Sequence, residues 1–204
     1  MTAPDNLVYF LGVSVALTVA PGPDVIFLAS QGLAGGPRAG LAVALGLSTG
    51  LLAHTALAAL GVSAVFAASP AAFGLVKWAG AAYMVWLAWC AFRERPVAAG
   101  ARGPAGSAAA LYRRGIVMNL LNPKVALFFL ALLPQFVDPA RGPVRAQMAV
   151  LGLVFMAQVV VVFGTIGYLS GRLGERFLPG AGHARAIAAA KGLVFLSVAV
   201  LLSL

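Results

Sequence analysis

Long apolar runs determine what this chain can fold into. A transmembrane α-helix needs about 20 consecutive, mostly apolar residues, and the sequence offers six such segments, at about 7–31, 39–67, 73–92, 115–136, 146–170 and 187–204. The chain is 62% hydrophobic and 9% charged, whereas soluble domains are about 45–50% apolar and about 25% charged. We therefore predict an all-α integral membrane protein with six transmembrane helices in a single membrane domain over residues 1–204.

Proline interrupts the first and fourth of these segments, in "APGPD" (Ala20–Asp24) and "MNLLNPK" (Met118–Lys124). Proline removes a helical hydrogen bond and clashes with the preceding turn. A bilayer tolerates such irregular backbone where it is buried in protein or lines a cavity. A broken helix exposes carbonyl groups before the break, which suit a cation, and N–H groups after it, which suit a carboxylate. Two opposed breaks would therefore suit a zwitterion such as an amino acid.

The two halves of the chain share a series of glycines and prolines in the same order. The matches are Pro23-Asp24-Val25 with Pro123-Lys124-Val125, Gly36-Pro37 with Gly142-Pro143, Gly46 with Gly152, and Gly80 and Tyr83 with Gly192 and Phe195. They predict two three-helix repeats, at about 1–95 and about 113–204, joined by a linker at about 96–112 that is rich in Arg, Gly, Pro and Ala. Because three is odd, the second repeat is inverted, as in many secondary transporters whose sites lie at broken helices near the bilayer midplane.

Ionisable residues inside apolar segments are the strongest candidates for function, because a charge at the membrane centre costs about 2.5–3.5 kcal/mol. Asp24 and Lys124 occupy matching repeat positions, and the alternative to a functional role is that they pair or that Lys124 extends to the interface. His54 titrates near physiological pH, which suits proton coupling; the alternative is a buried neutral imidazole with a backbone partner. Asp24 and His54 are thus the proton-coupling candidates, and Gln158 is expected to hydrogen-bond between helices.

The residues at the two breaks are the substrate-binding candidates. They are Pro21, Gly22, Pro23, Asp24, Asn119, Asn122, Pro123 and Lys124. We predict no catalytic residues, metal site or cofactor. One cysteine excludes an intramolecular disulfide or a paired-thiol redox centre, and two histidines with few carboxylates make a poor metal-ligand set. Because Ser/His/Asp and metal-hydrolase spacings are also lacking, we predict that the protein is not an enzyme.

Basic residues give the chain a net charge of +9. Cytoplasmic loops of membrane proteins collect Lys and Arg, so we predict no nucleic-acid partner. The richer side carries Arg38, Arg93, Arg95, Arg102, Arg113, Arg114, Arg172, Arg176 and Arg185, and the opposite side carries Lys77, Arg141 and Arg145. If the richer side is cytoplasmic, both termini lie outside. The partners expected are membrane lipid and a small-molecule substrate, and the sequence is compatible with a homodimer as well as a monomer.

The sequence resembles the lysine exporter (LysE/RhtB) family of bacterial amino-acid efflux transporters. The resemblance lies in "TVAPGPDVIFLASQGLAGGPRAGLAVALGLSTG", "KWAGAAYMVWLAW" and "GIVMNLLNPKVALFFLALLPQFVDP", and it covers nearly the whole chain. It implies a six-span, inner-membrane exporter of amino acids or related metabolites, driven by the proton gradient through alternating access. By motif match it assigns roles to Pro21, Gly22, Pro23, Asn122, Pro123 and Lys124.

Asp24 departs from the family pattern, because relatives often carry Asn or another residue there; this difference points to substrate selectivity. The alternative function is efflux of metal or other inorganic ions, as in related six-span families, and the poor ligand set of this chain disfavours it. The resemblance does not indicate which amino acid is exported.

Overall fold

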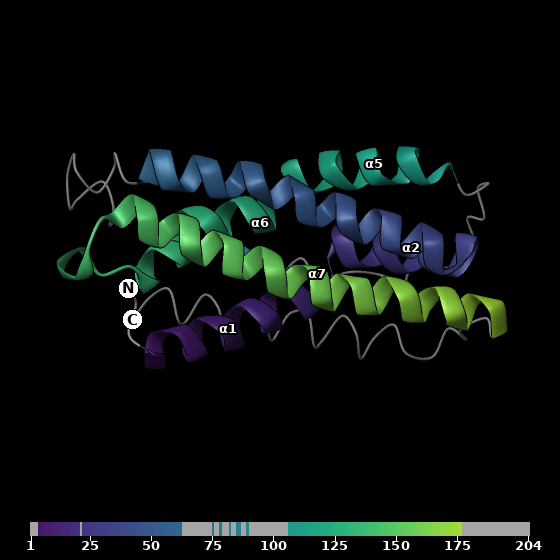
Figure 1. The fold of residues 1–204 in the computed structure, drawn as a ribbon, viewed down its shortest axis with the longest axis horizontal. Helices are drawn as coiled ribbons and strands as arrows, with labels where there is room; N and C mark the ends of the chain where they lie inside the picture. The colour runs from purple at the N-terminus through teal and green to yellow at the C-terminus, as the bar shows by residue number, and fades with distance from the viewer. Residues whose placement is uncertain are drawn as a thin grey trace.

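The described part of the structure, a computed structural model, consists of helices. It covers residues 4–20, 22–62, 75, 78, 82, 85, 86, 89 and 106–176, and it contains no strand within those residues. The elements are α1 (Pro4–Val19), α2 (Pro23–Leu57) with a π-helical turn (Ala58–Val62), α5 (Ala108–Leu120), α6 (Pro123–Leu127), a second π-helical turn (Phe128–Leu132), two 3₁₀ turns (Leu133–Phe136 and Pro139–Arg141) and α7 (Val144–Arg176) (Figure 1). An all-α chain is thus confirmed for these residues.

Both predicted breaks are present. Helix α1 ends at Val19 and α2 begins at Pro23, while α5 ends at Leu120 and α6 begins at Pro123. The helical segments on either side of the second break are bent by 49°. Proline is well suited to the first position of a helix, because its missing N–H would be unbonded there. Pro21 lies outside the described residues, so the first break is defined by its neighbours.

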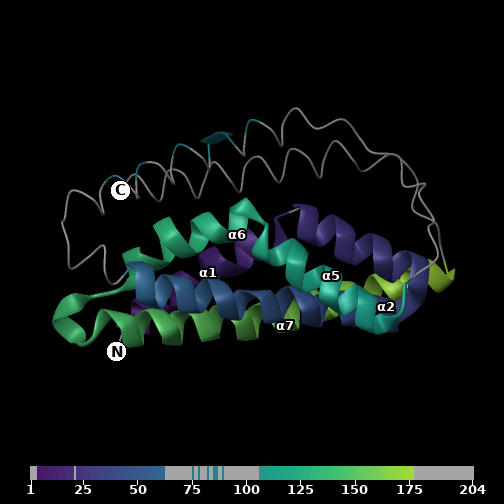
Figure 2. The same cartoon turned by 90° about the horizontal axis from the view of Figure 1, so that it is seen from above.

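Helix α2 contains a corner at Gly36. This residue has φ 78 and ψ −176, a conformation that L side chains rarely adopt and glycine adopts readily. Pro37 follows and fixes the direction of the next helical part. The chain reverses there, so the two parts of α2 run back along each other (Figure 2). The corner falls between the predicted first and second spans, 7–31 and 39–67, as the sequence suggested.

The predicted six spans are only partly represented in the described residues. By length and composition, two segments qualify as membrane-crossing helices: Pro23–Gly61, which contains the corner at Gly36, and Val144–Gly174. The bent pair Ala108–Leu120 with Pro123–Phe136 supplies a third candidate. The predicted span at 187–204 and most of that at 73–92 lie outside the described residues, so the count of six and the inverted repeat remain predictions. Apolar side chains that stay exposed, such as Leu45 (52%), Val161 (67%) and Leu173 (54%), are what a lipid-facing surface requires.

Two helix boundaries differ from the predicted ones. Helix α5 begins at Ala108, inside the stretch expected to be linker, rather than at 115. Ser107 caps it by accepting a hydrogen bond from the Ala110 N–H. Ala, Leu and Arg in its first turns favour a helix, although Arg113 and Arg114 lower the hydropathy of the segment. Helix α7 extends beyond both ends of the predicted span 146–170.

Small residues let α2 and α7 approach closely. Gly40 of α2 and Gly167 of α7 meet backbone to backbone, and Gly171 lies against the corner at Gly36 and Pro37. Glycines at such crossings allow helices to pack through van der Waals contacts, which drive helix association in membranes.

We expect Gly171→Ala to destabilise the protein and Gly164→Ala, on the same helix, to leave it nearly unchanged. A Cβ atom at Gly171 would collide with the backbone of Gly36 and Pro37, whereas one at Gly164 meets no atom of the described residues within 4 Å. Overpacking of this kind costs about 1–3 kcal/mol. Thermal unfolding of the two variants in detergent measures the difference, and equal midpoints would show that α7 does not pack against the α2 corner at Gly171.

Candidate functional site

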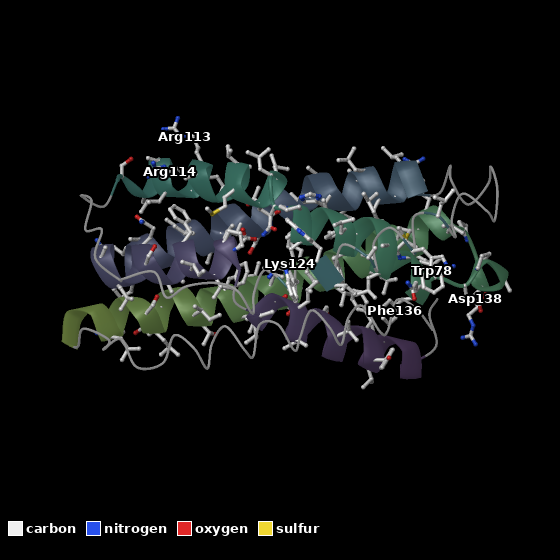
Figure 3. All side chains as sticks on the ribbon, turned by 180° about the vertical axis from the view of Figure 1, so that it is seen from behind. Trp78, Arg113, Arg114, Lys124, Phe136 and Asp138 are labelled. Carbon is white, nitrogen blue, oxygen red and sulfur yellow. The ribbon has the colours of Figure 1, made fainter. Side chains whose placement is uncertain are left out.

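Five polar side chains are buried where the two breaks meet. Asp24, Asn119, Asn122, Lys124 and His54 are 1%, 1%, 3%, 4% and 7% exposed. Lys124 lies near the middle of the long axis, whereas Arg113 and Arg114 lie toward one end and Asp138 toward the other (Figure 3). A buried cation at mid-length of a membrane helix bundle is costly unless its surroundings compensate it, so its partners define the site.

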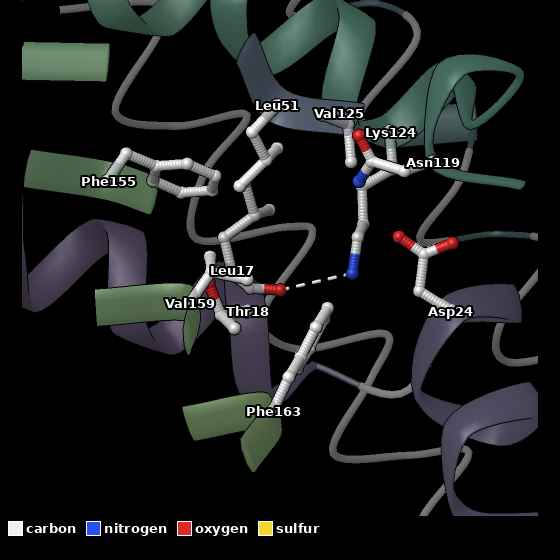
Figure 4. A pocket seen from close by; sticks show the side chains of 10 residues that line it. All are labelled: Leu17, Thr18, Asp24, Leu51, Asn119, Lys124, Val125, Phe155, Val159 and Phe163. Atoms are coloured by element: carbon white, nitrogen blue, oxygen red, sulfur yellow. Dashed lines mark hydrogen bonds between the residues drawn. The ribbon is translucent and has the colours of Figure 1, made fainter. Parts of the chain in front are cut away.

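Lys124 binds the carbonyl end of α1. Its ammonium Nζ donates a hydrogen bond to the carbonyl oxygen of Leu17, at 3.1 Å (Figure 4). It donates a second one to the carbonyl oxygen of Ala20, at 3.2 Å. Leu17 precedes Pro21 by four residues, and a proline has no N–H to donate to that carbonyl. The break thus leaves a carbonyl without its helical donor, and an ammonium from the other half of the chain takes that donor's place.

Asp24 faces the same ammonium from the first turn of α2 (Figure 4). Its carboxylate interacts electrostatically with Lys124, with the side-chain amides of Asn122 and Asn119, and with His54. Within the described part of the chain, however, Asp24 Oδ1, Asn119 Oδ1 and Asn122 Nδ2 are buried without a hydrogen-bond partner. An unsatisfied buried polar group costs about 1–3 kcal/mol, so these three atoms, close to the Lys124 ammonium, mark this place as a candidate site.

At the second break, His54 bonds a freed carbonyl as Lys124 does at the first break. Its Nε2 lies 3.1 Å from the carbonyl oxygen of Asn119, and because a carbonyl can only accept, Nε2 carries the hydrogen. Asn119 precedes Pro123 by four residues, so this too is a carbonyl that a proline deprives of its helical donor; the Asn122 N–H also reaches it, at 3.0 Å. The His54 ring stacks on Phe129, with centroids 5.7 Å apart. The backbone partner that the sequence left open is therefore present.

A small cavity adjoins these groups. It is lined by Leu17, Thr18, Asp24, Leu51, Asn119, Lys124, Val125, Phe155, Val159 and Phe163 (Figure 4). Its free space of about 20 Å³ is close to the minimum that holds one water molecule. The polar lining comes from the breaks and the apolar wall from α7, so an enlarged form of the cavity would suit a small molecule with a charged end and an apolar end.

The structure brings together seven of the eight predicted site residues. Gly22 is part of the group, because a Cβ atom there would lie 3.2 Å from Lys124 Nζ. Pro23 and Pro123 begin the helices that carry Asp24 and Lys124, and Asn122 caps α6 by accepting from the Lys124 N–H at 3.0 Å. Pro21 lies outside the described residues.

Other contributors were not identified from the sequence. The carbonyl groups of Leu17 and Ala20 bind the ammonium, and the position of Pro21 was a signal for the first of them. Phe155 and Phe163 line the cavity, but their sequence context does not separate them from packing residues. The predicted interhelical role of Gln158 is confirmed, since its Nε2 donates to Thr18 Oγ1 at 2.8 Å.

Comparison with known proteins identifies the family. The family model described as LysE type translocator matches residues 15–204, which include both breaks. The chain belongs to the LysE-type translocator family. This LysE-family chain is 40% identical over 157 residues to an uncharacterized membrane protein of Vibrio cholerae, covering 76% of each chain. It is 34% identical over 199 residues to the homoserine/homoserine lactone efflux protein of Salmonella typhimurium, covering 95% of this chain and 94% of that one.

A further relative of this LysE-family chain is a leucine efflux protein of an Enterobacter species, at 31% identity over 127 residues, which cover 60% of this chain and 59% of that protein. No solved structure matches the chain. The resemblance seen in the sequence is thereby confirmed.

Proposed function

We propose that this LysE-family protein exports an amino acid or a closely related small metabolite across the bacterial inner membrane. The observation that carries the proposal is the Lys124 ammonium on the freed carbonyls of α1, facing an Asp24 carboxylate whose Oδ1 has no hydrogen-bond partner in the described chain. The relatives named for efflux of homoserine and leucine support it. Metal or inorganic-ion efflux draws no support from those relatives.

In the proposed binding mode the substrate lies between the two breaks. Its carboxylate is attracted by Lys124 and by the N-terminal ends of α2 and α6, which carry partial positive charge. Its ammonium is attracted by the carbonyl end of α1. Its side chain contacts the apolar wall of Phe155, Val159 and Phe163. Pro21, Gly22, Pro23 and Pro123 shape the breaks, and Asn119 and Asn122 supply the amide groups.

Export by alternating access requires the α1–α2 and α5–α6 breaks to open the cavity to each side in turn, because its present free space does not admit an amino acid. We propose that the proton gradient drives this cycle and that Asp24 or His54 carries the proton. The matching positions of Asp24 and Lys124, each directly after the proline that begins a helix, support the two inverted repeats from which such a cycle is built.

The export experiment uses a mixture of the twenty protein amino acids and homoserine, loaded into cells that express the protein or carry the empty vector. We expect one amino acid, or a few related ones, to leave faster when the protein is present, because the pocket combines fixed charges with an apolar wall of limited size. Mass spectrometry of the medium identifies them. Identical release of every amino acid by the two strains, with the protein present in the membrane, would refute the proposal.

We further propose that the end carrying Arg113 and Arg114 is cytoplasmic, with both termini outside. The two arginines are exposed at one end of the helices, whereas Arg141 pairs with Asp138 at the other (Figure 3). The richer basic side faces the cytoplasm as a rule.

Labelling with a membrane-impermeant maleimide tests this orientation in a Cys90→Ser background, which lacks cysteine. In intact cells we expect reaction at Ala140→Cys and protection at Gly106→Cys, two positions that are both exposed. Reaction at Gly106→Cys and protection at Ala140→Cys would mean that the orientation is inverted.

A further inference from the structure

We infer that the carbonyl end of α1 is an ammonium-binding site at which the Lys124 side chain competes with the amino group of the transported molecule. The inference deepens the proposed function and rests on it. It assigns the site to backbone oxygens of Leu17 and Ala20 rather than to a side chain. The Lys124 ammonium fills this site when no substrate is bound.

The contacts of the ammonium support a built cation site. Two carbonyl oxygens at the end of one helix accept from the same Nζ, at 3.1 and 3.2 Å. Carbonyl groups at a helix C-terminus carry partial negative charge, and in a membrane they have no water to bond instead. Lys124 is 4% exposed, so its ammonium is held by the protein rather than by solvent.

Asp24 supplies the second observation. It is 1% exposed, its Oδ1 lacks a hydrogen-bond partner among the described residues, and it lines the cavity beside Lys124 (Figure 4). The flexible lysine stem carries three donors that can turn between acceptors. An incoming ammonium can therefore take the Leu17 and Ala20 carbonyls while Lys124 turns to Asp24 and to the carboxylate of the incoming molecule.

Charge balance favours this exchange. Asp24 and Lys124 together are neutral, and a zwitterionic amino acid adds no net charge, so the filled site contains two ammonium groups and two carboxylates. Until the substrate enters, Lys124 keeps the α1 carbonyls bonded, which lets the site close around a cavity of about 20 Å³.

Gly22 leaves the room that an ammonium needs at this place. A Cβ atom there would lie 3.2 Å from Nζ and 3.6 Å from Cε of Lys124. The backbone of Gly22 is extended, with φ −144 and ψ −179, so alanine fits its conformation, and the atom nearest to its Cβ would be the Lys124 ammonium. Gly12 of α1, where a Cβ atom meets nothing within 4 Å in the part of the chain that the structure describes, is the matched control.

The test fills the site from solution. Lys124→Ala removes three carbons and the nitrogen, which n-propylammonium replaces atom for atom. Since a ligand of the native state raises stability by mass action, we expect n-propylammonium chloride to raise the unfolding temperature of purified Lys124→Ala in detergent and to leave the wild type nearly unchanged. Tetramethylammonium, which has no N–H group, should raise the unfolding temperature of neither protein. Adding Gly22→Ala should reduce the shift, and adding Gly12→Ala should preserve it.

Equal shifts in Lys124→Ala and wild type, or equal shifts with the two cations, would overturn the inference. If Lys124→Ala does not fold, Lys124→Met retains the stem and leaves the Nζ position open, and ammonium chloride replaces n-propylammonium with the same expected contrast.

A competition arm tests the link to the transported molecule. Excess n-propylammonium should displace from Lys124→Ala the labelled amino acid that the export experiment identifies; binding of both without mutual effect would refute the shared site. Efflux by the wild type without any ammonium effect in the variants would overturn this inference and leave the proposed function standing. An ammonium effect without efflux of any amino acid would do the reverse.

Discussion

Replacing Lys124 by methionine should sharply destabilise the protein and abolish efflux. The substitution removes the ammonium that now donates to the carbonyls of Leu17 and Ala20. It also removes the positive charge that faces the Asp24 carboxylate, a side chain that is only 1% exposed. Removing one partner of a buried charge pair costs about 3–5 kcal/mol. Thermal unfolding in detergent and efflux from loaded cells, at matched membrane levels, measure the two effects.

The double variant Asp24→Asn/Lys124→Met is the control for the stability effect. It removes both charges and keeps side chains of similar size, and neutral replacement of a buried pair is often tolerated. We expect it to recover most of the stability lost in Lys124→Met without recovering efflux. A double variant no more stable than Lys124→Met would show that the Asp24 charge is not what Lys124 compensates.

Asp24→Asn should lose proton-driven efflux by more than about tenfold, the equivalent of about 1.4 kcal/mol in an activation barrier, while keeping gradient-independent exchange of amino acid across the membrane. A proton carrier is needed for the driven cycle and not for exchange. Asp24 has a carboxylate oxygen without a hydrogen-bond partner in the described chain, whereas His54 is engaged with the Asn119 carbonyl and stacked on Phe129. We therefore expect Asp24, rather than His54, to carry the proton.

His54→Gln is the matched variant, because a glutamine amide can still donate to the Asn119 carbonyl. We expect it to keep both driven efflux and exchange within about a factor of three, less than about 1 kcal/mol. Paired assays in proteoliposomes, with and without an imposed pH gradient, separate the two activities. Loss of driven efflux in His54→Gln with retention in Asp24→Asn would transfer the role to His54. Loss of both activities in Asp24→Asn would make Asp24 a substrate ligand instead.

Local signals in the sequence predicted the breaks and the corner well. Proline acts within one helical turn, so Pro23 and Pro123 located the starts of α2 and α6. The gap between the predicted spans 7–31 and 39–67 located the reversal at Gly36 inside α2. The start of α5 was predicted too late, because Arg113 and Arg114 lower the hydropathy of a segment whose helix propensity is high.

The partners inside the site were beyond the reach of local patterns. Lys124 binds carbonyls 104 and 107 residues away, and His54 binds one 65 residues away. A proline shows which carbonyl loses its donor but not which side chain replaces it, since that depends on how the helices pack. The apolar wall from α7 was hidden for the same reason, because Phe155 and Phe163 differ from other apolar residues only in what they face.

The most direct test of the proposed site is efflux from proteoliposomes that contain either the wild type or the double variant Asp24→Asn/Lys124→Met, loaded with the amino acid that the export experiment identifies. We predict that the wild type releases it under an imposed pH gradient. The double variant, folded by the criterion of its unfolding temperature, should release it no faster than protein-free vesicles. Release by the folded double variant at the wild-type rate would contradict the account, because transport would then need neither charge at the two helix breaks.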